Sequence, residues 1–365
     1  MKLGDQIKFK LKAILVVVLI SGAIGALYAR LITPYTKPID LLQGIFTGMG
    51  VSLSIAASDV FFLGEWMKRR RFTTAVLLTT IYDLIAITGI LILSYSIFGK
   101  SHSMALSFGQ LLESPEAHNI ILFCLVMSFL FSLLVQINGL IGPRIFFSFF
   151  TGKYHKPIEE DRIFMFLDLK SSTAIAEKIG HINFHKFMND FLFTISATII
   201  SNKGEIYKYV GDEVIITWKM KEGLKDLHCI RLFFEALDRV KEHRSLFEKE
   251  YGVVPEFKAG IHCGKVVSGE MGYIKKEIAF LGDVINTTAR IENECNPHQR
   301  SLLISGDLLQ RITLGREYQY EKVGDINLRG KKKRNELYAI DKKFNEKDKQ
   351  LGVQSDKRRR KVFLH

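Results

Sequence analysis

The stretch IYKYVGDEVIITW, from Ile206 to Trp218, carries the clearest structural signal in the chain. Two runs of β-branched and aromatic residues flank a Gly-Asp-Glu turn, a pattern typical of two largely buried strands joined by a tight hairpin. Asp212 lies at the tip of this hairpin, and Lys208 precedes it by four residues. A hairpin needs neither charged group in order to fold, so both are candidate functional residues. The alternative is a surface hairpin whose charged side chains are simply solvated.

Strand-like and helix-like segments alternate around the hairpin. The run RIFMFLDL, residues 162–169, is almost continuously apolar and predicts a central buried strand that ends at Asp168. Apolar residues at helical spacing predict a helix over 183–201. Further along, the sequence predicts a helix over 224–250, strands over 256–262 and 265–271, and a helix capped by Asp283. This alternation within about 180 residues indicates an α/β or α+β domain with a single sheet.

The first half of the 365-residue chain has a different character, because apolar residues crowd its first 150 positions. Four apolar runs, each close to the roughly 20 residues that a helix needs to cross a bilayer, predict an all-α four-span domain over residues 1–141. The runs are Ala13 to Ile32, Leu41 to Leu63, Thr74 to Phe98 and Asn119 to Ile141. Lys and Arg gather before the first run, between the second and third, and after the fourth. The sequence therefore predicts a multi-pass protein of the cell membrane with both termini in the cytosol.

The remaining segments are a connector over 142–160 and a basic tail over 343–365. From Lys342 to the end there are nine Lys or Arg and three Asp or Glu. The tail is predicted to be disordered, and its KRRRK run at 357–361 could contact anionic lipid. Nucleic acid is not an expected partner of a membrane-tethered chain without aromatic residues among these charges. The four scattered cysteines form no CxxC pair, so neither a zinc site nor a disulfide framework is indicated.

Two pairs of polar residues suggest chemistry on a phosphate ester. If the strands that carry Asp168 and Asp212 are neighbours, both carboxylates converge at one end of the sheet, and with phosphate oxygens they could hold Mg²⁺ or Mn²⁺. Lys208 would then point into a pocket beside Asp212. Asn286 and Arg290 stand four residues apart and share one helix face, where they could orient a sugar and neutralise charge on phosphorus. An ordinary exposed polar face is the alternative.

Five segments, in order, resemble the catalytic domain of class III nucleotide cyclases, the adenylate and guanylate cyclase family. They are FLDLKSSTAIAE, GEIYKYVGDEVIITW, FKAGIHCGKVVSGEMG, FLGDVINTTARIE and VGDINLRGKKKRNELYAI. The resemblance implies a ferredoxin-like α/β catalytic domain over residues 161–342. The four-span region looks like the membrane anchors that precede many bacterial cyclases of this class.

The resemblance also implies a role for each candidate on the strands. Asp168 and Asp212 match the two aspartates that bind two Mg²⁺ (or Mn²⁺) ions in each active site. Lys208 matches the lysine that recognises the purine. The second base-reading position is Ala279, whose side chain can neither donate nor accept a hydrogen bond, so the resemblance leaves the choice between ATP and GTP open.

The other matched positions concern the ribose and the phosphates. Asn286 matches the asparagine that orients the ribose, and Arg290 matches the arginine that stabilises the pentavalent phosphorus. Arg329 falls where a basic residue contacts the terminal phosphates, with Lys331 as a nearby helper. In the family the metal-binding aspartates come from one subunit and the lysine, asparagine and arginine from the other. The resemblance therefore implies a homodimer with two shared sites.

The function that the resemblance implies is an adenylate cyclase, a lyase that converts ATP to cyclic AMP and pyrophosphate. A guanylate cyclase is one alternative, and a catalytically silent cyclase-like receptor that only dimerises is another. Diguanylate cyclases share a similar hairpin, but they need a doubled glycine before the acidic pair, whereas this chain has Val210 and Gly211 there.

Overall fold

The computed structural model describes residues 3–32, 37–57, 72–98, 151–326 and 335–343, together with isolated positions between 122 and 149. The chain divides into two units, Met1–Phe146 and Phe147–His365. Several predictions fall outside the described residues: the roles of Arg329 and Lys331, most of the predicted fourth span, and all of the basic tail but its first residue.

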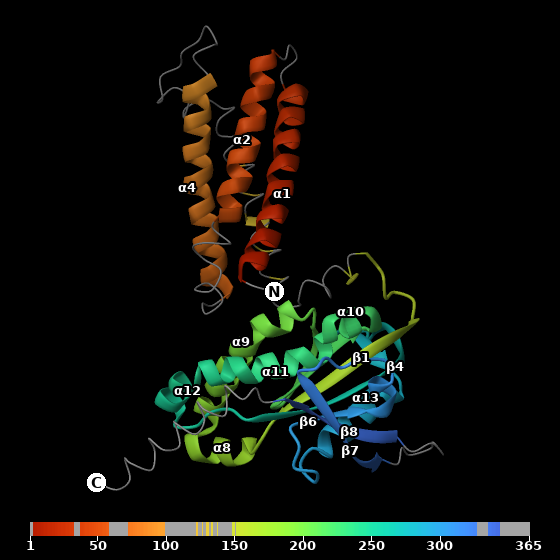
Figure 1. Cartoon of the computed structure of the whole chain (residues 1–365). Coiled ribbons are helices and arrows are strands. Elements are labelled where there is room, and N and C mark those ends of the chain that lie inside the picture. The colour runs from red at the N-terminus through yellow and green to blue at the C-terminus, as the bar shows by residue number, and fades with distance from the viewer. Residues whose placement is uncertain are drawn as a thin grey trace, which may run out of the picture. The chain divides into compact units, whose positions relative to one another are not determined.

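Three helices are described in the first unit, α1 (Leu3–Ile32), α2 (Pro38–Ala57) and α4 (Phe72–Phe98) (Figure 1). Among the described residues, two helical segments are long and apolar enough to cross a membrane, Pro38–Ile55 and Leu77–Phe98. The helix α1 covers the first predicted span, and the apolar stretch described within it is Val18–Leu31. Two of the four predicted spans thus meet this criterion, and the four-span arrangement stays a prediction.

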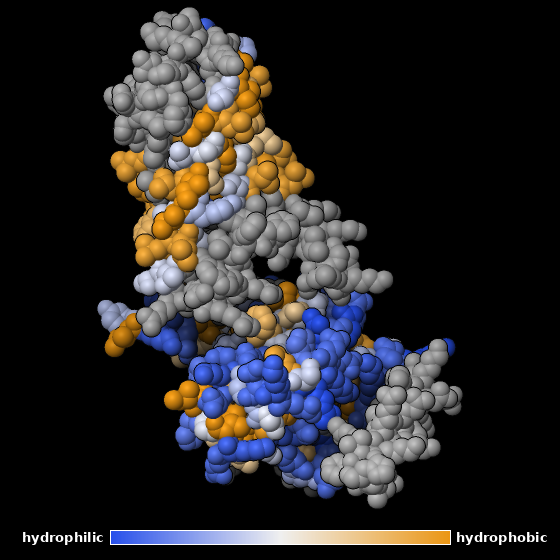
Figure 2. Space-filling model, turned by 90° about the vertical axis from the view of Figure 1, so that its left-hand side faces the viewer, coloured by the Kyte–Doolittle hydropathy of each residue, from blue (hydrophilic) through white to orange (hydrophobic). Residues whose placement is uncertain are grey.

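Large apolar side chains lie on the outside of these helices. Leu19 and Ile24 on α1, Leu53 on α2 and Ile85 on α4 are each more than half exposed, whereas Asp83 on α4 is buried. Figure 2 shows hydrophobic residues over the surface of this unit, in contrast to the mainly hydrophilic surface of the second unit. An apolar exterior around a buried carboxyl is the reverse of a water-soluble bundle, and it suits a lipid environment.

The contact between α1 and α2 depends on glycine. A Cβ atom on Gly44 would lie 2.4 Å from the carbonyl oxygen of Gly25, and one on Gly48 would lie 2.2 Å from that of Ser21. Only residues without a side chain allow two helix backbones to approach this closely. The pair Gly44 and Gly48, spaced as GxxxG, therefore packs two helices of the same chain together.

The second unit is built on a mixed sheet of eight strands. They are β1 (Ile158–Leu169), β2 (Glu205–Val210), β3 (Glu213–Lys219), β4 (Phe257–Met271), β5 (Glu277–Leu281), β6 (Leu302–Ser305), β7 (Tyr318–Ile326) and β8 (Asn335–Lys342). The order is β2-β3-β1-β4-β6-β8-β7, with β5 paired to β4. With the helices between them, the first four strands follow the β-α-β-β-α-β order of the ferredoxin-like arrangement. The predicted α/β domain with a single sheet is confirmed.

The helices of this unit cover both faces of the sheet. They are α8 (Ser172–Ile179), α9 (His181–Ser201), α10 (Met220–Leu224), a 3-10 turn (Lys225–Leu227), α11 (His228–Glu242), α12 (Arg244–Tyr251), α13 (Asp283–Asn293) and α14 (Gly306–Leu309). Figure 1 shows α9 and α11 along one side of the sheet. Met165 and Leu167 of β1 join Phe191 of α9 and Phe233 of α11 in the main core. Side chains alternate along a strand, so Phe164, Phe166 and Asp168 point to the opposite face.

Three details differ from the sequence-based expectations. The strand β2 is the edge of the sheet, and its Tyr209 and Val210 are more than half exposed, whereas two buried strands were expected. The predicted helix over 224–250 is broken, because Asp226 and Leu227 have positive φ angles of 50° and 54°. Lastly, Gly282 rather than Asp283 occupies the N-cap of α13, so Asp283 is the first helical residue.

The two strands predicted over 256–262 and 265–271 are one continuous strand, β4. A Cβ atom on Gly260 would lie 2.3 Å from the backbone nitrogen of Glu292, and one on Gly264 would lie 2.8 Å from Val284 Cγ2. Both glycines stand on the same face of β4, where α13 packs. The prediction of a break at Gly264 was wrong because this glycine permits close packing and makes no turn.

Gly260→Ala is expected to lower the free energy of unfolding of the second unit by about 2 kcal/mol or more, because the new methyl group meets backbone atoms of α13 that must move. The measurement is thermal unfolding of the detergent-solubilised chain. Gly269→Ala on the same strand is the matched control, since its Cβ would make only ordinary contacts of 3.4–3.5 Å with Pro157. Equal unfolding temperatures for the two variants would contradict the packing described here.

Candidate active site

The carboxylates of Asp168 and Asp212 lie at the same end of the sheet. The strand β1 pairs antiparallel with β3, and this register sets Asp168 opposite Glu213. Asp212 directly precedes Glu213 in the hairpin turn, where Gly211 takes a φ of 64° that favours glycine. The hairpin thus presents Asp212 and Glu213 beside the end of β1.

A buried lysine lies against this acidic end of the sheet. Lys258 of β4 pairs with Asp168 in the strand register, and its Nζ is 3.4 Å from Asp168 Oδ2 and 2.7 Å from Glu292 Oε1. Glu292 comes from α13, which reaches β4 because Gly260 lacks a side chain. The sequence reasoning missed both residues. The only signal in the sequence was a single lysine in the otherwise apolar run FKAGI. Its role becomes clear only from the packing of α13, which brings Glu292 to this lysine.

Burial and mutual repulsion together raise the pKa of two carboxyl groups at this end of the sheet. Burial, with repulsion from Asp212 and Glu292, raises the pKa of Asp168 to about 6. Burial and repulsion from Glu292, Asp168 and Asp212 raise the pKa of Glu213 to about 7. Lys258 offsets part of this repulsion in both cases. A divalent cation would offset the repulsion that remains between the carboxylates, so the negative charge at this end of the sheet suits the binding of such an ion.

The same carboxylates do not form a complete metal cage. Within the part of the chain that the structure describes, no group of three or more His, Cys, Asp or Glu residues is arranged to hold a metal ion. Mg²⁺ is usually bound by one or two carboxylates together with water and substrate phosphates. An ion at Asp168 and Asp212 would therefore take its remaining ligands from the substrate or from water.

A pocket of about 450 Å³ opens beside Asp168 at the end of β1. It is lined by Asp168, Leu169, Lys170, Ser171, Ser172, Thr173, Lys258 and Asn296. Ser171 adopts a left-handed conformation and precedes the first turn of α8, whose free backbone amides carry partial positive charge. Two lysines and these polar groups make the pocket suitable for an anionic ligand next to the carboxylates.

Asn286 and Arg290 lie on α13 but face away from the carboxylates of their own chain. The helix buries Glu292 against the sheet, whereas Asn286 is exposed and Arg290 is half-buried. At 3.6 residues per turn, Asn286 is rotated by about 120° and Arg290 by about 160° from Glu292 around the helix axis. The two residues share a face, as predicted, but it is not the face that meets Asp168.

Lys208 was expected to point into a pocket beside Asp212, but it is not among the residues that line the pocket at Asp168. Its Nζ lies 3.3 Å from Oε1 of Glu277 on β5. The strand β5 lies against β2, since the backbone N–H of Phe280 donates to the hydroxyl of Tyr207 at 3.5 Å and the two rings are 4.8 Å apart. Ala279, two residues from Glu277, is buried. The structure therefore gathers Lys208, Glu277 and Ala279 around β5.

The raised pKa values predict how the metal-free protein responds to pH. A carboxyl whose pKa is higher in the folded than in the unfolded state contributes stability at low pH, and this contribution is lost as pH rises through the folded-state pKa. Relative to the wild type, Glu213→Gln should therefore gain stability between about pH 5 and pH 7.5, by on the order of 1 kcal/mol. Thermal unfolding in a chelating buffer across this range measures the difference. A difference that does not change with pH would contradict the raised pKa of Glu213.

Comparison with known proteins identifies the family to which the second unit belongs. Residues 155–342 match the family model described as the adenylate and guanylate cyclase catalytic domain. The chain is similar to "Adenylate cyclase 2" of Rhizobium meliloti, with 33% identity over 213 residues, which cover 58% of this chain and 59% of the relative. It is also similar to the receptor-type guanylate cyclase Gyc76C of Drosophila melanogaster, with 28% identity over 187 residues, 49% of this chain and 12% of the relative. The chain thus spans less than two thirds of each relative.

Among solved structures, the fold is similar to that of a bacterial light-regulated adenylyl cyclase. The TM-score is 0.55 at 18% sequence identity, and the match covers 64% of this chain and 69% of the other. The family model covers just over half of the sequence and includes every described residue of the acidic end of the sheet. The chain therefore belongs to the family of adenylate and guanylate cyclase catalytic domains.

Proposed function

We propose that this chain is a membrane-anchored adenylate cyclase that converts ATP to 3′,5′-cyclic AMP and pyrophosphate. The observation that carries the proposal is the placement of Asp168 and Asp212 at one end of the sheet, beside a pocket that contains Lys258 and Lys170. A nucleoside triphosphate binds together with cations, so its site needs carboxylates that hold the cations and, beside them, ammonium groups that hold the phosphates.

Asp168 and Asp212 would hold two Mg²⁺ or Mn²⁺ ions. When bound, such ions activate the ribose 3′ hydroxyl and neutralise the triphosphate. Lys258 and Lys170 would draw the phosphates into the pocket, and Asn286 and Arg290 would orient the ribose and stabilise charge on the α-phosphorus. The 3′ oxygen forms a bond to the α-phosphorus in line with the departing pyrophosphate, so the protein contributes alignment and electrostatics. We place Arg329 and Lys331 at the terminal phosphates on the resemblance alone.

The active site is proposed to lie between two copies of the chain. Within one chain the face of α13 that carries Asn286 and Arg290 is turned away from Asp168, so one chain cannot apply both sets of residues to one nucleotide. Exposed apolar side chains support an interface, because Tyr273 at the tip of the β4–β5 hairpin is 97% exposed and Ile274 beside it is fully exposed. A symmetric homodimer would complete two sites.

Adenine specificity is the finer part of the proposal. Lys208, whose ammonium group can only donate hydrogen bonds, favours the acceptor nitrogen N1 of adenine. The Ala279 side chain offers no hydrogen-bond acceptor for the adenine amino group. This favours the second candidate, a guanylate cyclase. The described relatives include proteins named for each activity.

The membrane part of the proposal extends beyond the two described helices that are long enough to span. We propose four spans within residues 1–141, with both termini in the cytosol, because Lys and Arg gather on one side of the apolar runs. The connector over 142–160 would lead into the catalytic domain over 161–342. The basic tail over 343–365 would contact anionic lipid of the inner leaflet.

Turnover of ATP and GTP by membranes containing the full chain tests the function. Cyclic AMP should form with Mg²⁺ or Mn²⁺ and disappear when the cations are chelated, and cyclic GMP should form more slowly. Preferential formation of cyclic GMP would select the guanylate cyclase. If neither product forms with either metal, the enzyme proposal fails and the silent receptor is favoured.

A further inference from the structure

The ion pair between Lys208 and Glu277 joins two strands that are far apart in the sequence. Lys208 lies on β2 and Glu277 on β5, and their charged atoms are 3.3 Å apart. The side chains are 46% and 43% exposed, so a ligand can reach both. Side chains two residues apart on a strand share one face, which places Glu277 on the same side of β5 as Ala279. The pair thus offers a donor and an acceptor side by side.

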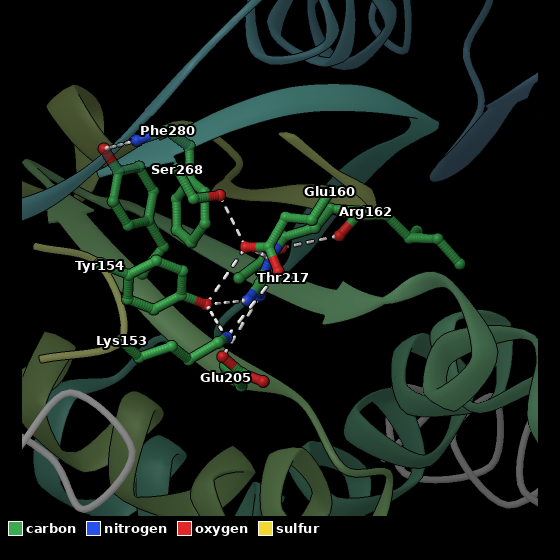
Figure 3. Close-up of polar contacts among 10 residues, drawn as sticks. Lys153, Tyr154, Glu160, Arg162, Glu205, Thr217, Ser268 and Phe280 are labelled. Carbon is green, nitrogen blue, oxygen red and sulfur yellow. Dashed lines mark hydrogen bonds and ion pairs between the residues drawn. The ribbon is translucent and has the colours of Figure 1, made fainter. Parts of the chain in front are cut away.

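A buried arginine holds the strands behind this pair. The Arg162 side chain is 1% exposed, and its guanidinium group donates to Glu160 at 2.8 Å and to Glu205 of β2 at 3.3 Å. The guanidinium also lies over the ring of Phe280 of β5, 4.6 Å from its centre. Figure 3 shows these residues around Arg162, which shares β1 with Glu160, whereas Glu205 and Phe280 come from other strands.

The same network includes the chain that precedes β1. Tyr154 accepts a hydrogen bond from Arg162 at 3.0 Å and donates one to Glu160 at 3.1 Å, and Ser268 of β4 donates to Glu160 at 2.6 Å. A buried charge is stable only when it is paired and hydrogen-bonded. Here Glu160 of the same strand, Glu205 of β2, Ser268 of β4 and Tyr154 of the connector supply these contacts. The network therefore fixes β2 and β5 relative to each other, and with them Lys208 and Glu277.

We infer that Glu277 is a specificity-determining residue, which supplies the hydrogen-bond acceptor that Ala279 lacks. This inference rests on the proposed function, in which Lys208 meets the purine. Adenine presents an acceptor nitrogen beside a 6-amino donor. Lys208 donates to the first, and the carboxylate of Glu277 accepts from the second. Guanine carries a carbonyl oxygen where adenine has its amino group, so the Glu277 carboxylate would face another acceptor and disfavour GTP.

The contribution of this pair to folding is small, which makes the inference testable. An ion pair between two side chains this exposed adds little to stability, because water screens it and both side chains lose rotamer freedom. A variant without the Glu277 carboxylate should therefore fold like the wild type. A change in nucleotide preference can then be assigned to recognition.

The experiment compares Glu277→Ala and Glu277→Gln with the wild type, as full chains in membranes, with MgATP and MgGTP. The Ala variant is expected to lower kcat/KM for ATP by about 10-fold to 100-fold, while kcat/KM for GTP is unchanged or higher, since a buried polar match is lost only for adenine. Gln retains an acceptor oxygen, so its variant should fall between the two. Glu159→Gln, which breaks the exposed pair of Glu159 with Lys265 elsewhere on the sheet, should leave the ATP to GTP ratio unchanged.

The outcomes separate this inference from the function on which it rests. If the wild type makes neither cyclic nucleotide, the proposed function itself fails. If the wild type makes cyclic AMP and Lys208→Ala weakens ATP use, but Glu277→Ala keeps the wild-type ATP to GTP ratio, Glu277 does not read the base and only the inference is overturned. An equal loss for ATP and GTP with Glu277→Ala would likewise overturn it, because a specificity-determining residue must act on one purine more than on the other.

Discussion

Asp168→Asn is expected to reduce the rate of cyclic AMP formation by about 10³-fold or more, because it removes a charged ligand from the proposed cation site. The same change should leave the fold intact or stabilise it near neutral pH. Burial and repulsion from Asp212 and Glu292 raise the pKa of Asp168 to about 6, so a neutral side chain at this position relieves repulsion in the metal-free protein. Loss of activity with an unchanged or higher unfolding temperature is a combination that a purely structural role cannot produce.

Asp161→Asn is the matched control for this prediction. Asp161 lies on the same strand, β1, but is exposed and stands opposite Lys265 of β4, far along the strand from Asp168. Its replacement should leave turnover within about 2-fold of the wild type, as expected for an exposed surface charge. Similar losses for the two variants would mean that the effect at Asp168 comes from general electrostatics of the strand.

Arg290→Ala is expected to lower kcat by about 10²-fold to 10³-fold, because a cationic group that meets charge developing on phosphorus acts mainly in the transition state. The KM for ATP should change much less than kcat. Arg290 is half-buried and lies on the face of α13 opposite Glu292, so the packing of this helix on β4 does not depend on it.

Arg244→Ala is the control for charge removal from a helix. Arg244 pairs with Glu248 one turn along α12, with the donor and acceptor 2.7 Å apart and both side chains about half exposed. Its loss should leave kcat and KM unchanged. If Arg290→Ala raised KM and left kcat unchanged, Arg290 would bind the substrate and the transition state equally, and it would not stabilise the transition state selectively.

The hairpin and the strand before it were the parts of the fold that the sequence predicted best. Alternating β-branched residues around Gly211, and the apolar run that ends at Asp168, are local patterns, and local patterns specify strands well. The convergence of Asp168 and Asp212 followed from the assumption that these strands are neighbours, and the register of β1 with β3 places them so.

Features that depend on contacts between distant segments were not predictable. Lys258 and Glu292 meet because Gly260 lets α13 approach β4, and neither residue stands out in its own segment. For the same reason Gly264 looked like a turn between two strands. Glu277 was overlooked because its partner, Lys208, is separated from it by 69 residues and is brought near only by the position of β5.

Burial and helix breaks were also difficult to predict from local pattern. The strand β2 has the composition of a buried strand, yet its Tyr209 and Val210 are exposed at the edge of the sheet. The helix predicted over 224–250 is interrupted at Asp226 and Leu227, although neither residue is a glycine or a proline. Local preference is too weak to decide either the burial of a strand or the position of a helix break.

Mixing two inactive variants tests most directly whether the catalytic centre is shared between two chains. Asp168→Asn and Arg290→Ala are co-expressed at equal levels and cyclic AMP formation is measured. In randomly formed dimers half are mixed, and each mixed dimer keeps one site with both groups intact, so activity should return to about a quarter of the wild-type value. A shared site would be contradicted if mixed dimers are shown to form and their activity is no higher than that of either variant alone.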